Sequence, residues 1–391
     1  MGYQLEKENL IKPKKKRPLR KAIVETSYES DTTLVNSLVE KGLKVIEDRK
    51  LNVFKIECDV VIVGSGCGGV AVVVLVKSGQ KVVVVEKGHY FVAEDYSSLE
   101  GPSLSQLYES GEVLSTLHGK CMKLAGSTVG GGLAVNWSAS IKIPTSLLKK
   151  WALDHKILFF GTSDYVYAMD IVCKIIGVTE RCSKEGFYNQ VLKKVYKNYG
   201  LKVEYLPWNC SEDHSCSSYC YGCEAGDKRG TDITWLVDAV ILTGCKAERF
   251  ILEKNHSVRI RKKKCVGLIT SICSNKKITK RLEIKAKVMR TASGSLLTSP
   301  LMLSSGLKNP NIRKNLHLHP ILMVWRYFPE TLTNLPGKTF QGGIITSLHK
   351  ILSHESEFDV QTVIEEPTLG PASFGVLLPW VSGHDTKKKL L

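Results

Sequence analysis

Hydrophobic positions along the chain fall into short runs that glycine-rich or polar segments separate. The clearest run, Val60 to Val63, is continuous, as in a strand with both faces buried. The glycine-rich segment 64–69 (GSGCGG) follows it, and an apolar segment over 70–76 comes next. A second buried run, 81–85, ends at Glu86. This order predicts a strand, a tight turn, a helix and a second, parallel strand.

Glycines occupy the first, third and sixth positions of the turn: Gly64, Gly66 and Gly69. In a βαβ dinucleotide site, the first allows the tight turn, the second lets the backbone approach a pyrophosphate, and the third lets the helix pack on the strand. The helix N-terminus offers N–H groups to the phosphates. Glu86 follows about 20 residues later, where a carboxylate accepts hydrogen bonds from ribose hydroxyls. The spacing predicts a nucleotide site, and the alternative is a plain glycine loop in a parallel sheet.

Periodicity elsewhere predicts several helices. Asp31-Thr32 would cap a short helix that ends at Gly42. Residues 151–177 are mainly helical in pattern, and residues 188–199 form an amphipathic helix that ends at Gly200. Residues 1–30 are charged and punctuated by proline, so we expect an extended or disordered lead-in there.

Strand-like runs dominate the second half of the chain. Those at 240–242, 250–252, 259–272 and 278–289 alternate with charged turns, which is typical of a β-meander. Those at 319–328, 342–350 and 373–380 are separated by polar loops and suggest an antiparallel sheet in a second domain.

Two further segments are rich in small residues, which indicates that their backbones approach something closely. Residues 125–137 (AGSTVGGGLAVNW) combine several glycines with an apolar helix start that carries Asn136. Residues 291–306 (TASGSLLTSPLMLSSG) are a small-residue turn that leads into a helix. The first suits a second loop against a cofactor, and the alternative is a flexible glycine loop.

Composition and charge narrow the classes of function. The chain of 391 residues carries a net charge of +17, much of it in clusters at 12–21, 259–264 and 276–281. Nucleic-acid binding, a nuclear signal and contact with an anionic membrane would each use such clusters. No aromatic residues alternate with these lysines, as a single-strand binding surface would require, so we favour solvated loops and expect no nucleic-acid partner.

The targeting features of the sequence are few. No apolar run approaches the roughly 20 residues that a transmembrane helix needs. The N-terminus is polar and charged, unlike a signal peptide. We therefore expect a soluble intracellular chain, with peripheral membrane contact as the alternative.

The twelve cysteines are expected to be reduced in an intracellular chain. Four of them are close together in the segment 209–223 (NCSEDHSCSSYCYGC), and Cys216, Cys220 and Cys223 form a CxxxCxxC pattern near His214. This pattern could hold zinc or an iron–sulfur cluster. Because no second CxxC pair lies at zinc-ribbon distance, we favour a thiol-rich loop without metal.

Together these motifs resemble the glucose–methanol–choline (GMC) flavoprotein oxidoreductases, and within them the plant long-chain fatty alcohol oxidases. The resemblance rests on GSGCGG with Glu86, on AGSTVGGGLAVNW, and on ASGSLLTSPLMLSSGL followed by NLHLHP. It implies FAD as cofactor, a long-chain primary alcohol as hydride donor and O2 as acceptor, with an aldehyde and hydrogen peroxide as products. It also implies membrane association in full-length members.

The resemblance implies an α/β fold. A doubly wound, Rossmann-like FAD-binding domain with an inserted β-meander would be joined to part of an antiparallel-sheet (α+β) substrate domain. We assign residues 1–51 to the lead-in, 52–318 to the FAD-binding domain with a helical, Cys-rich insert at about 145–230, and 319–391 to an incomplete substrate domain.

The resemblance also assigns cofactor contacts by matching position. Glu86 and the first turn would hold the ADP part, Ala247 would lie against adenine, and the other two segments would contact pyrophosphate and flavin. The residues assigned are Val63, Gly64, Ser65, Gly66, Cys67, Gly68, Gly69, Glu86, Gly126, Ser127, Gly131, Asn136, Ala247, Ala292, Ser293 and Gly294.

Departures from the family pattern concern catalysis. The family uses a C-terminal histidine as general base, and no segment here resembles that one, so no catalytic residue is assigned. The late histidines, which lie in other contexts, are His317, His319, His349, His354 and His384. We therefore expect a truncated form with weak or no turnover. The alternative is a non-catalytic nucleotide-binding or membrane-surface protein.

Overall fold

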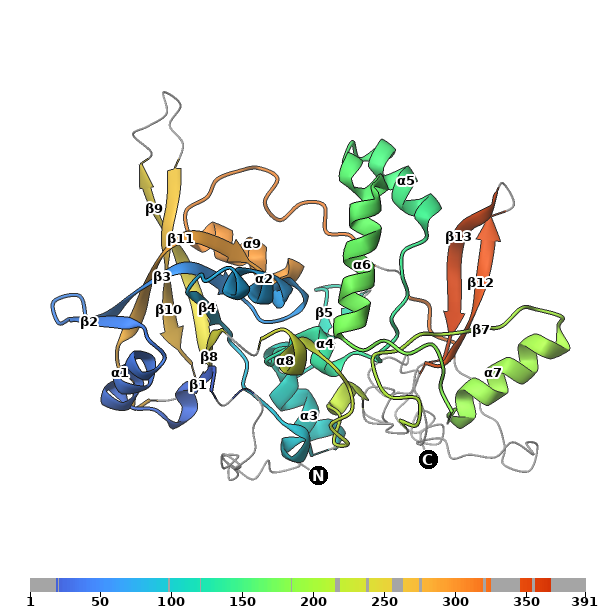
Figure 1. Cartoon of the computed structure of the whole chain (residues 1–391), viewed down its shortest axis with the longest axis horizontal. Coiled ribbons are helices and arrows are strands. Elements are labelled where there is room, and N and C mark those ends of the chain that lie inside the picture. Colours follow the sequence, from blue (N-terminus) through green and yellow to red (C-terminus); the bar gives the residue numbers. More distant parts are fainter. Residues whose placement is uncertain are drawn as a thin grey trace.

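The computed structural model describes residues 19, 21–97, 99–119, 121–183, 185–214, 219–236, 239–254, 263–273, 276–318, 321–324, 345–353 and 356–366. Two main sheets lie at opposite sides of the molecule, and helices α5 (Thr145–Asp154) and α6 (Ser163–Ile175) lie between them (Figure 1). The predicted strands at 373–380 and most of that at 319–328 fall outside the described residues. Residues 321–324 form neither helix nor strand.

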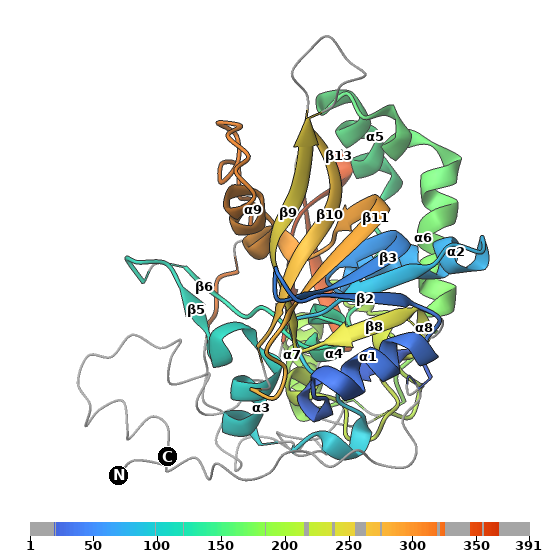
Figure 2. The same cartoon turned by 90° about the vertical axis from the view of Figure 1, so that its left-hand side faces the viewer.

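The larger sheet has eight strands within the described residues. Five of them are parallel neighbours in the order β1 (Ile23–Glu25), β8 (Val240–Thr243), β4 (Val82–Val85), β3 (Val53–Val63) and β11 (Arg281–Thr291). The sheet continues with antiparallel β10 (Lys263–Ile272) and β9 (Cys245–Lys254), and β2 (Lys44–Asp48) pairs antiparallel with the first half of β3. Figure 2, turned by 90°, shows this sheet at the front, facing the viewer.

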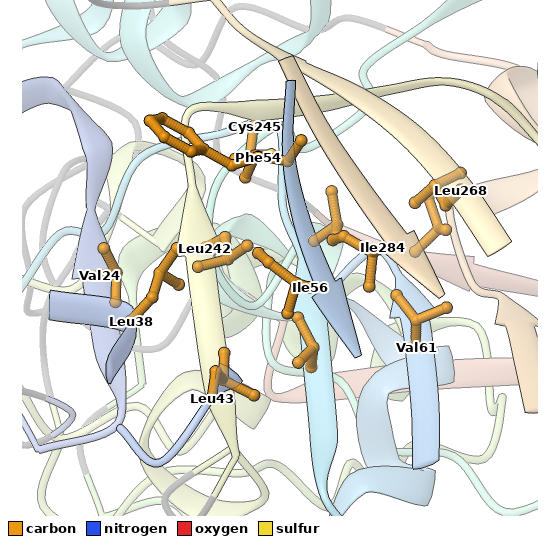
Figure 3. Packing of buried hydrophobic residues seen from close by; sticks show 14 of the residues in the cluster. Val24, Leu38, Leu43, Phe54, Ile56, Val61, Leu242, Cys245, Leu268 and Ile284 are labelled. Atoms are coloured by element: carbon orange, nitrogen blue, oxygen red, sulfur yellow. The ribbon is translucent and has the colours of Figure 1, made fainter. Parts of the chain in front are cut away.

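The continuous apolar runs are explained by burial on both faces of this sheet. On β3, Val61 and Val63 belong to one core cluster, while Val60 and Ile62 belong to the other. Figure 3 shows the first cluster, in which side chains of β3 meet those of β8, β11 and helix α1 (Asp31–Glu40). An alternating pattern would have left one face polar.

The predicted strand–turn–helix–strand unit is confirmed. β3 leads through a 3-10 turn (Cys67–Val70) into α2 (Ala71–Lys77) and on to β4, which pairs in parallel with β3 from Val60↔Val82 to Val63↔Val85. The other α-helices of the described residues are α3 (Glu100–Leu107), α4 (Gly132–Val135), α7 (Phe187–Asn198), α8 (Thr231–Thr234) and α9 (Gly294–Ser304).

The region predicted as a lead-in contributes to the large sheet. Residues 23–48 supply β1, α1 and β2, and Leu34 and Leu38 of α1 are fully buried against the sheet. The helix lies where it was expected, but its N-cap is Ser30, whose side chain accepts a hydrogen bond from the Thr33 amide. The prediction of Asp31-Thr32 as the cap was therefore wrong by one residue.

The smaller sheet is antiparallel, with the order β13 (Ser356–Glu365), β12 (Ser347–Ser353) and β7 (Glu204–Tyr205). Leu206 and Trp208, which follow β7, pack with Ile345 and Leu348 in one core cluster. The segment 145–230, predicted as an insert of the first domain, thus shares a sheet with the C-terminal region. A third pair, β5 (Leu114–Ser115) and β6 (Met122–Lys123), forms a short ribbon.

The fold is therefore mixed α/β, with a mostly parallel sheet and a small antiparallel sheet. In the part of the chain that the structure describes, no helix has the length and apolar composition to cross a membrane. The basic cluster at 276–281 is partly neutralised, since Lys280 lies 3.6 Å from Asp31 and 3.3 Å from Glu47. Most of the clusters at 12–21 and 259–264 lie outside the described residues.

Candidate functional site

A cavity of about 910 Å³ lies at the carboxyl ends of three parallel strands, where Val63, Val85 and Thr291 line it. In open parallel sheets this is the edge at which ligands bind. All the predicted cofactor residues except Gly69 and Asn136 line the cavity. They are Val63, Gly64, Ser65, Gly66, Cys67, Gly68, Glu86, Gly126, Ser127, Gly131, Ala247, Ala292, Ser293 and Gly294. Segments more than 200 residues apart thus meet around one space.

The first turn needs glycine for conformation and for close packing. Gly64 has φ +97°, and a Cβ there would lie 2.5 Å from the Ala292 carbonyl oxygen. A Cβ at Gly68 would lie 2.5 Å from the Ala292 Cβ. Gly66 differs, because a Cβ there would meet Gly131 Cα at an ordinary 3.6 Å. Gly66 is therefore not required by packing within the chain, and its small size leaves room on the cavity side.

Glu86 holds the first turn and the turn after β4 together. Its Oε2 accepts hydrogen bonds from the Ser65 amide (2.9 Å) and the Ser65 hydroxyl (2.6 Å), and its Oε1 accepts one from the Gly88 amide (2.7 Å). The side chain is nearly buried but still lines the cavity. Each carboxylate oxygen has two lone pairs, so these bonds leave acceptor capacity for a ligand hydroxyl.

Ser65 connects three segments of the site. Its buried hydroxyl also accepts a hydrogen bond from the Gly130 amide (3.1 Å), and its carbonyl accepts one from the Thr231 hydroxyl (3.0 Å). The Ser65 hydroxyl is thus engaged by Glu86 and Gly130. This makes its side chain a structural element of the site, while its backbone borders the cavity.

The second small-residue segment packs its backbone directly on the first turn. Gly131 has φ +54°, and a Cβ there would lie 2.9 Å from Gly66 Cα. The amides of Ser127 and Val129 donate to the carbonyls of Leu107 and His89, at 2.7 and 3.0 Å. The density of glycines in this segment is therefore explained by backbone-to-backbone contact.

The two predicted residues that do not line the cavity have other surroundings. Gly69 faces Leu236, whose Cδ2 would lie at an ordinary 3.5 Å from an added Cβ, so packing within the chain does not require glycine there. The Asn136 side-chain oxygen accepts a hydrogen bond from the Ser138 amide at 3.2 Å, and its carbonyl accepts one from Lys228 Nζ.

Sequence reasoning missed several residues that line the cavity. Lys87 forms an ion pair with Glu109 there, and the others are Gly132, Cys245, Lys246, Glu248, Ser271, Cys273, Leu297, Thr298, Pro300, Leu301 and Ser304. Lys87 could have been predicted as a site residue, because it comes shortly after the end of the second predicted strand, β4. No pattern in the sequence indicates Glu109 or Ser271, because only the tertiary fold brings them here.

Three thiols line the cavity in different environments. Cys67 and Cys273 are exposed, while Cys245 is fully buried. Burial raises the pKa of the Cys245 thiol to about 12, and desolvation by the surrounding walls also raises the pKa of Cys67. Because the thiolate is the reactive form, Cys245 should be inert at neutral pH.

The predicted metal candidates are only partly described. Cys216 lies outside the described residues, and Cys220 and Cys223 are buried. Cys223 Sγ is 3.8 Å from His214 Nε2, and His214 Nδ1 is 3.1 Å from an Asp227 oxygen. Among the described residues, no group of three or more His, Cys, Asp or Glu side chains is arranged to hold a metal ion.

The described late histidines do not line the cavity. His317 is exposed in a segment without regular structure. His349 lies on β12, where its Nδ1 bonds to the Lys202 carbonyl at 2.6 Å and its ring packs 5.0 Å from that of Tyr196. His319, His354 and His384 lie outside the described residues.

Comparison with known proteins agrees with the resemblance seen in the sequence. The family profile of GMC oxidoreductases matches residues 104–321, which is more than half of the chain. The long-chain-alcohol oxidases FAO4B and FAO3 of Arabidopsis thaliana are 55% and 54% identical to it over 384 residues. In each case the match covers 96% of this chain and 51% of the relative, so the chain spans about half the length of these relatives.

Among solved structures, a pyridoxine 4-oxidase from Mesorbium loti is similar with a TM-score of 0.47 and 17% identity, over 64% of this chain and 52% of that one. The family match covers two of the three cofactor segments and lies where the cavity is built. The chain belongs to the GMC oxidoreductase family.

Proposed function

We propose that this chain binds FAD in the large cavity, as part of an FAD-dependent oxidase of long-chain primary alcohols. The observation that carries the proposal is the meeting of the three small-residue segments around one cavity at the carboxyl ends of the parallel strands. A volume of about 910 Å³ is within the range of cofactor sites. GMC oxidoreductases are an FAD-dependent family, and the relatives named above are long-chain-alcohol oxidases.

The residues of the cavity suit the parts of FAD. Gly66, Cys67 and Gly68 of the first turn line the cavity, where their backbone N–H groups would stabilise the negative charge of the pyrophosphate. Glu86 would accept hydrogen bonds from the ribose hydroxyls, and the backbone of Ala247 would border the adenine. The loop with Gly126, Ser127 and Gly131 and the turn Ala292–Gly294 would enclose the remainder of the cofactor.

When bound, FAD supplies a hydride acceptor for the alcohol carbon, and O2 is the final acceptor in an oxidase. The described residues bind and orient the cofactor, and none of them is assigned as general base. We propose that residues 52–318 form most of the FAD-binding unit. The sheet β13–β12–β7 would belong to the substrate-binding unit, so this unit would include β7 from the 145–230 segment.

The test is a titration of the purified chain with FAD, followed by flavin fluorescence, for wild type, Gly66→Ala and Gly101→Ala. A Cβ at position 66 makes only ordinary contacts inside the protein, so the fold should persist while the pyrophosphate loses its close approach. Gly101, in α3, has no neighbour within 4 Å of an added Cβ and is the matched control.

We expect wild type and Gly101→Ala to bind FAD with the same affinity. For Gly66→Ala we expect the affinity to fall by about 10-fold or more, because roughly one charge-assisted hydrogen bond to the pyrophosphate is lost. Absence of flavin binding by the wild type would overturn the proposal. Peroxide formation from a long-chain primary alcohol, measured on the FAD-loaded chain, then tests the oxidase part separately.

A further inference from the structure

A second, smaller cavity of about 190 Å³ lies on the opposite side of the glycine-rich loop. Gly131 and Gly132 line the large cavity, while the next two residues, Leu133 and Ala134, line the small one. The short helix α4 therefore borders both spaces. A side chain that holds α4 in place from the small cavity therefore also fixes the position of Gly131 and Gly132, which line the large cavity.

Lys228 holds the C-terminal end of α4. It is buried, with 6% of its surface exposed, and lines the small cavity. Its Nζ donates hydrogen bonds to the carbonyl oxygens of Ala134 (3.3 Å) and Asn136. The last carbonyls of a helix have no partner within the helix and carry partial negative charge, so an ammonium group is a suitable partner for them.

The other end of the loop and Lys228 itself are both anchored. The Gly130 amide is bound by Ser65 of the first turn, as described above. The backbone of Arg229 exchanges hydrogen bonds with Asn209, through the Arg229 amide (2.9 Å) and the Asn209 side-chain amide (2.8 Å). The loop is thus hydrogen-bonded at its start to Ser65 and at its end to Lys228, whose neighbour Arg229 is in turn hydrogen-bonded to Asn209.

Taking an ammonium group out of water is unfavourable unless hydrogen bonds compensate it. Asp232 also lines the small cavity, and its Oδ1 is buried without a hydrogen-bond partner among the described residues. A neutral residue at position 228 would avoid the cost of burying the ammonium, although it would leave the Asp232 carboxylate without the nearby positive charge. Packing alone therefore gives no reason for a lysine here, whereas the two carbonyls of the cofactor loop do.

We propose that Lys228 is a positioning residue for the cofactor site: by binding the carbonyls of Ala134 and Asn136, it holds Gly131 and Gly132 where FAD contacts them. The inference rests on the proposed FAD binding. Lys228 does not line the large cavity, so its effect is transmitted through α4. Removing it should loosen the loop in the free chain and weaken FAD binding without removing any group that touches FAD.

The experiment compares wild type, Lys228→Met and the surface control Lys142→Ala, whose lysine pairs with Asp170. Amide hydrogen exchange in the FAD-free chain should rise at residues 130–136 in Lys228→Met and stay near wild type elsewhere. FAD affinity should fall by roughly 10-fold or more, as for loss of hydrogen bonds from a charged group. Lys142→Ala should match wild type in both.

A chemical-rescue experiment separates positioning from general damage. Lys228→Ala enlarges a cavity that already exists, and added n-propylammonium should restore FAD affinity because it replaces the donor. Isosteric n-propanol, which has no charged donor, should not restore it. The double variant Lys228→Met/Asp232→Asn removes both charges. If it regains wild-type affinity, the loss came from the unpaired Asp232 charge and the proposal is wrong.

The outcomes distinguish the two proposals. If wild type binds no FAD, the proposed function fails. If wild type binds FAD and Lys228→Met binds it equally, with unchanged exchange at 130–136, the cofactor proposal stands and the role of Lys228 is refuted.

Discussion

Glu86 and Ser65 illustrate how single residues of the site combine two tasks. Sequence spacing placed Glu86 at the end of the second strand and assigned it to ribose recognition. The structure adds hydrogen bonds from Ser65 and Gly88, which hold together the turns that follow β3 and β4. A substitution at Glu86 would therefore disturb the turn and any bound nucleotide together, which makes Gly66 the cleaner probe of binding.

Asp232 and Lys228 are buried groups with shifted pKa values. Burial raises the pKa of the Asp232 carboxyl to about 6, although the charge of Lys228 opposes this shift, and burial lowers the pKa of Lys228 to about 8. Around the carboxyl lie Lys228, Tyr96 and Cys223, which also line the small cavity.

The pKa of Asp232 predicts a pH-dependent stability difference. Because the folded state holds this proton up to about pH 6 and the unfolded state releases it near 4, the group stabilises the fold at low pH and loses that effect as pH rises through 6. Asp232→Asn lacks this dependence, so its stability relative to wild type should rise by on the order of 1–3 kcal/mol between pH 4 and 7. Urea unfolding of the FAD-free chains across this range measures it, and a constant difference would contradict the shift.

At the level of elements, the glycine-rich unit was predictable and the N-terminal contribution was not. The apolar runs of β3 and β4 are local, so their burial on both faces could be read from the sequence. The spacing of apolar residues that predicts helix α1 is also a local feature of the sequence. The place of this helix against the sheet, and the pairing of β1 with β8 more than 200 residues away, depend on long-range contacts. β13 was not predicted, because three charged residues are interspersed among the four apolar residues of its segment.

The packing of α1 can be tested with adjacent residues. Leu38 is fully buried in the first core cluster, whereas Val39 is 54% exposed on the same helix. Leu38→Ala should lower the free energy of unfolding by roughly 2–4 kcal/mol, since it creates a cavity against the sheet. Val39→Ala should change it by about 0.5 kcal/mol or less. Similar urea midpoints for the two variants would show that α1 does not pack on the sheet in solution.

At the level of the whole molecule, the cavity collects residues from distant parts of the chain and can be mapped by its thiols. Cys67 and Cys273 are exposed and line the cavity, whereas Cys121 and Cys173 lie outside it. Alkylation at pH 8.5, followed by peptide mass spectrometry, gives the rate at each residue in one sample.

Saturating FAD should protect Cys67 and Cys273 from alkylation. At an FAD concentration about 100 times Kd, roughly 1% of the chain is free, so labelling at both positions should slow strongly. The rates at Cys121 and Cys173 should not change, and Cys245 should remain unlabelled in both samples because its protonated thiol is buried. Equal labelling of Cys67 with and without FAD would place the cofactor elsewhere.

The sequence by itself determined the strand–turn–helix–strand unit, the three small-residue segments and the family, because each depends on residue types at short, regular spacing. Only the tertiary structure decided that these segments enclose one cavity, that Gly131 meets Gly66, and that Lys228 lies behind the loop. Such contacts join residues far apart in the chain, and periodicity carries no information about them. The first glycine turn is therefore predictable as a motif, while the site it belongs to exists only in the folded chain.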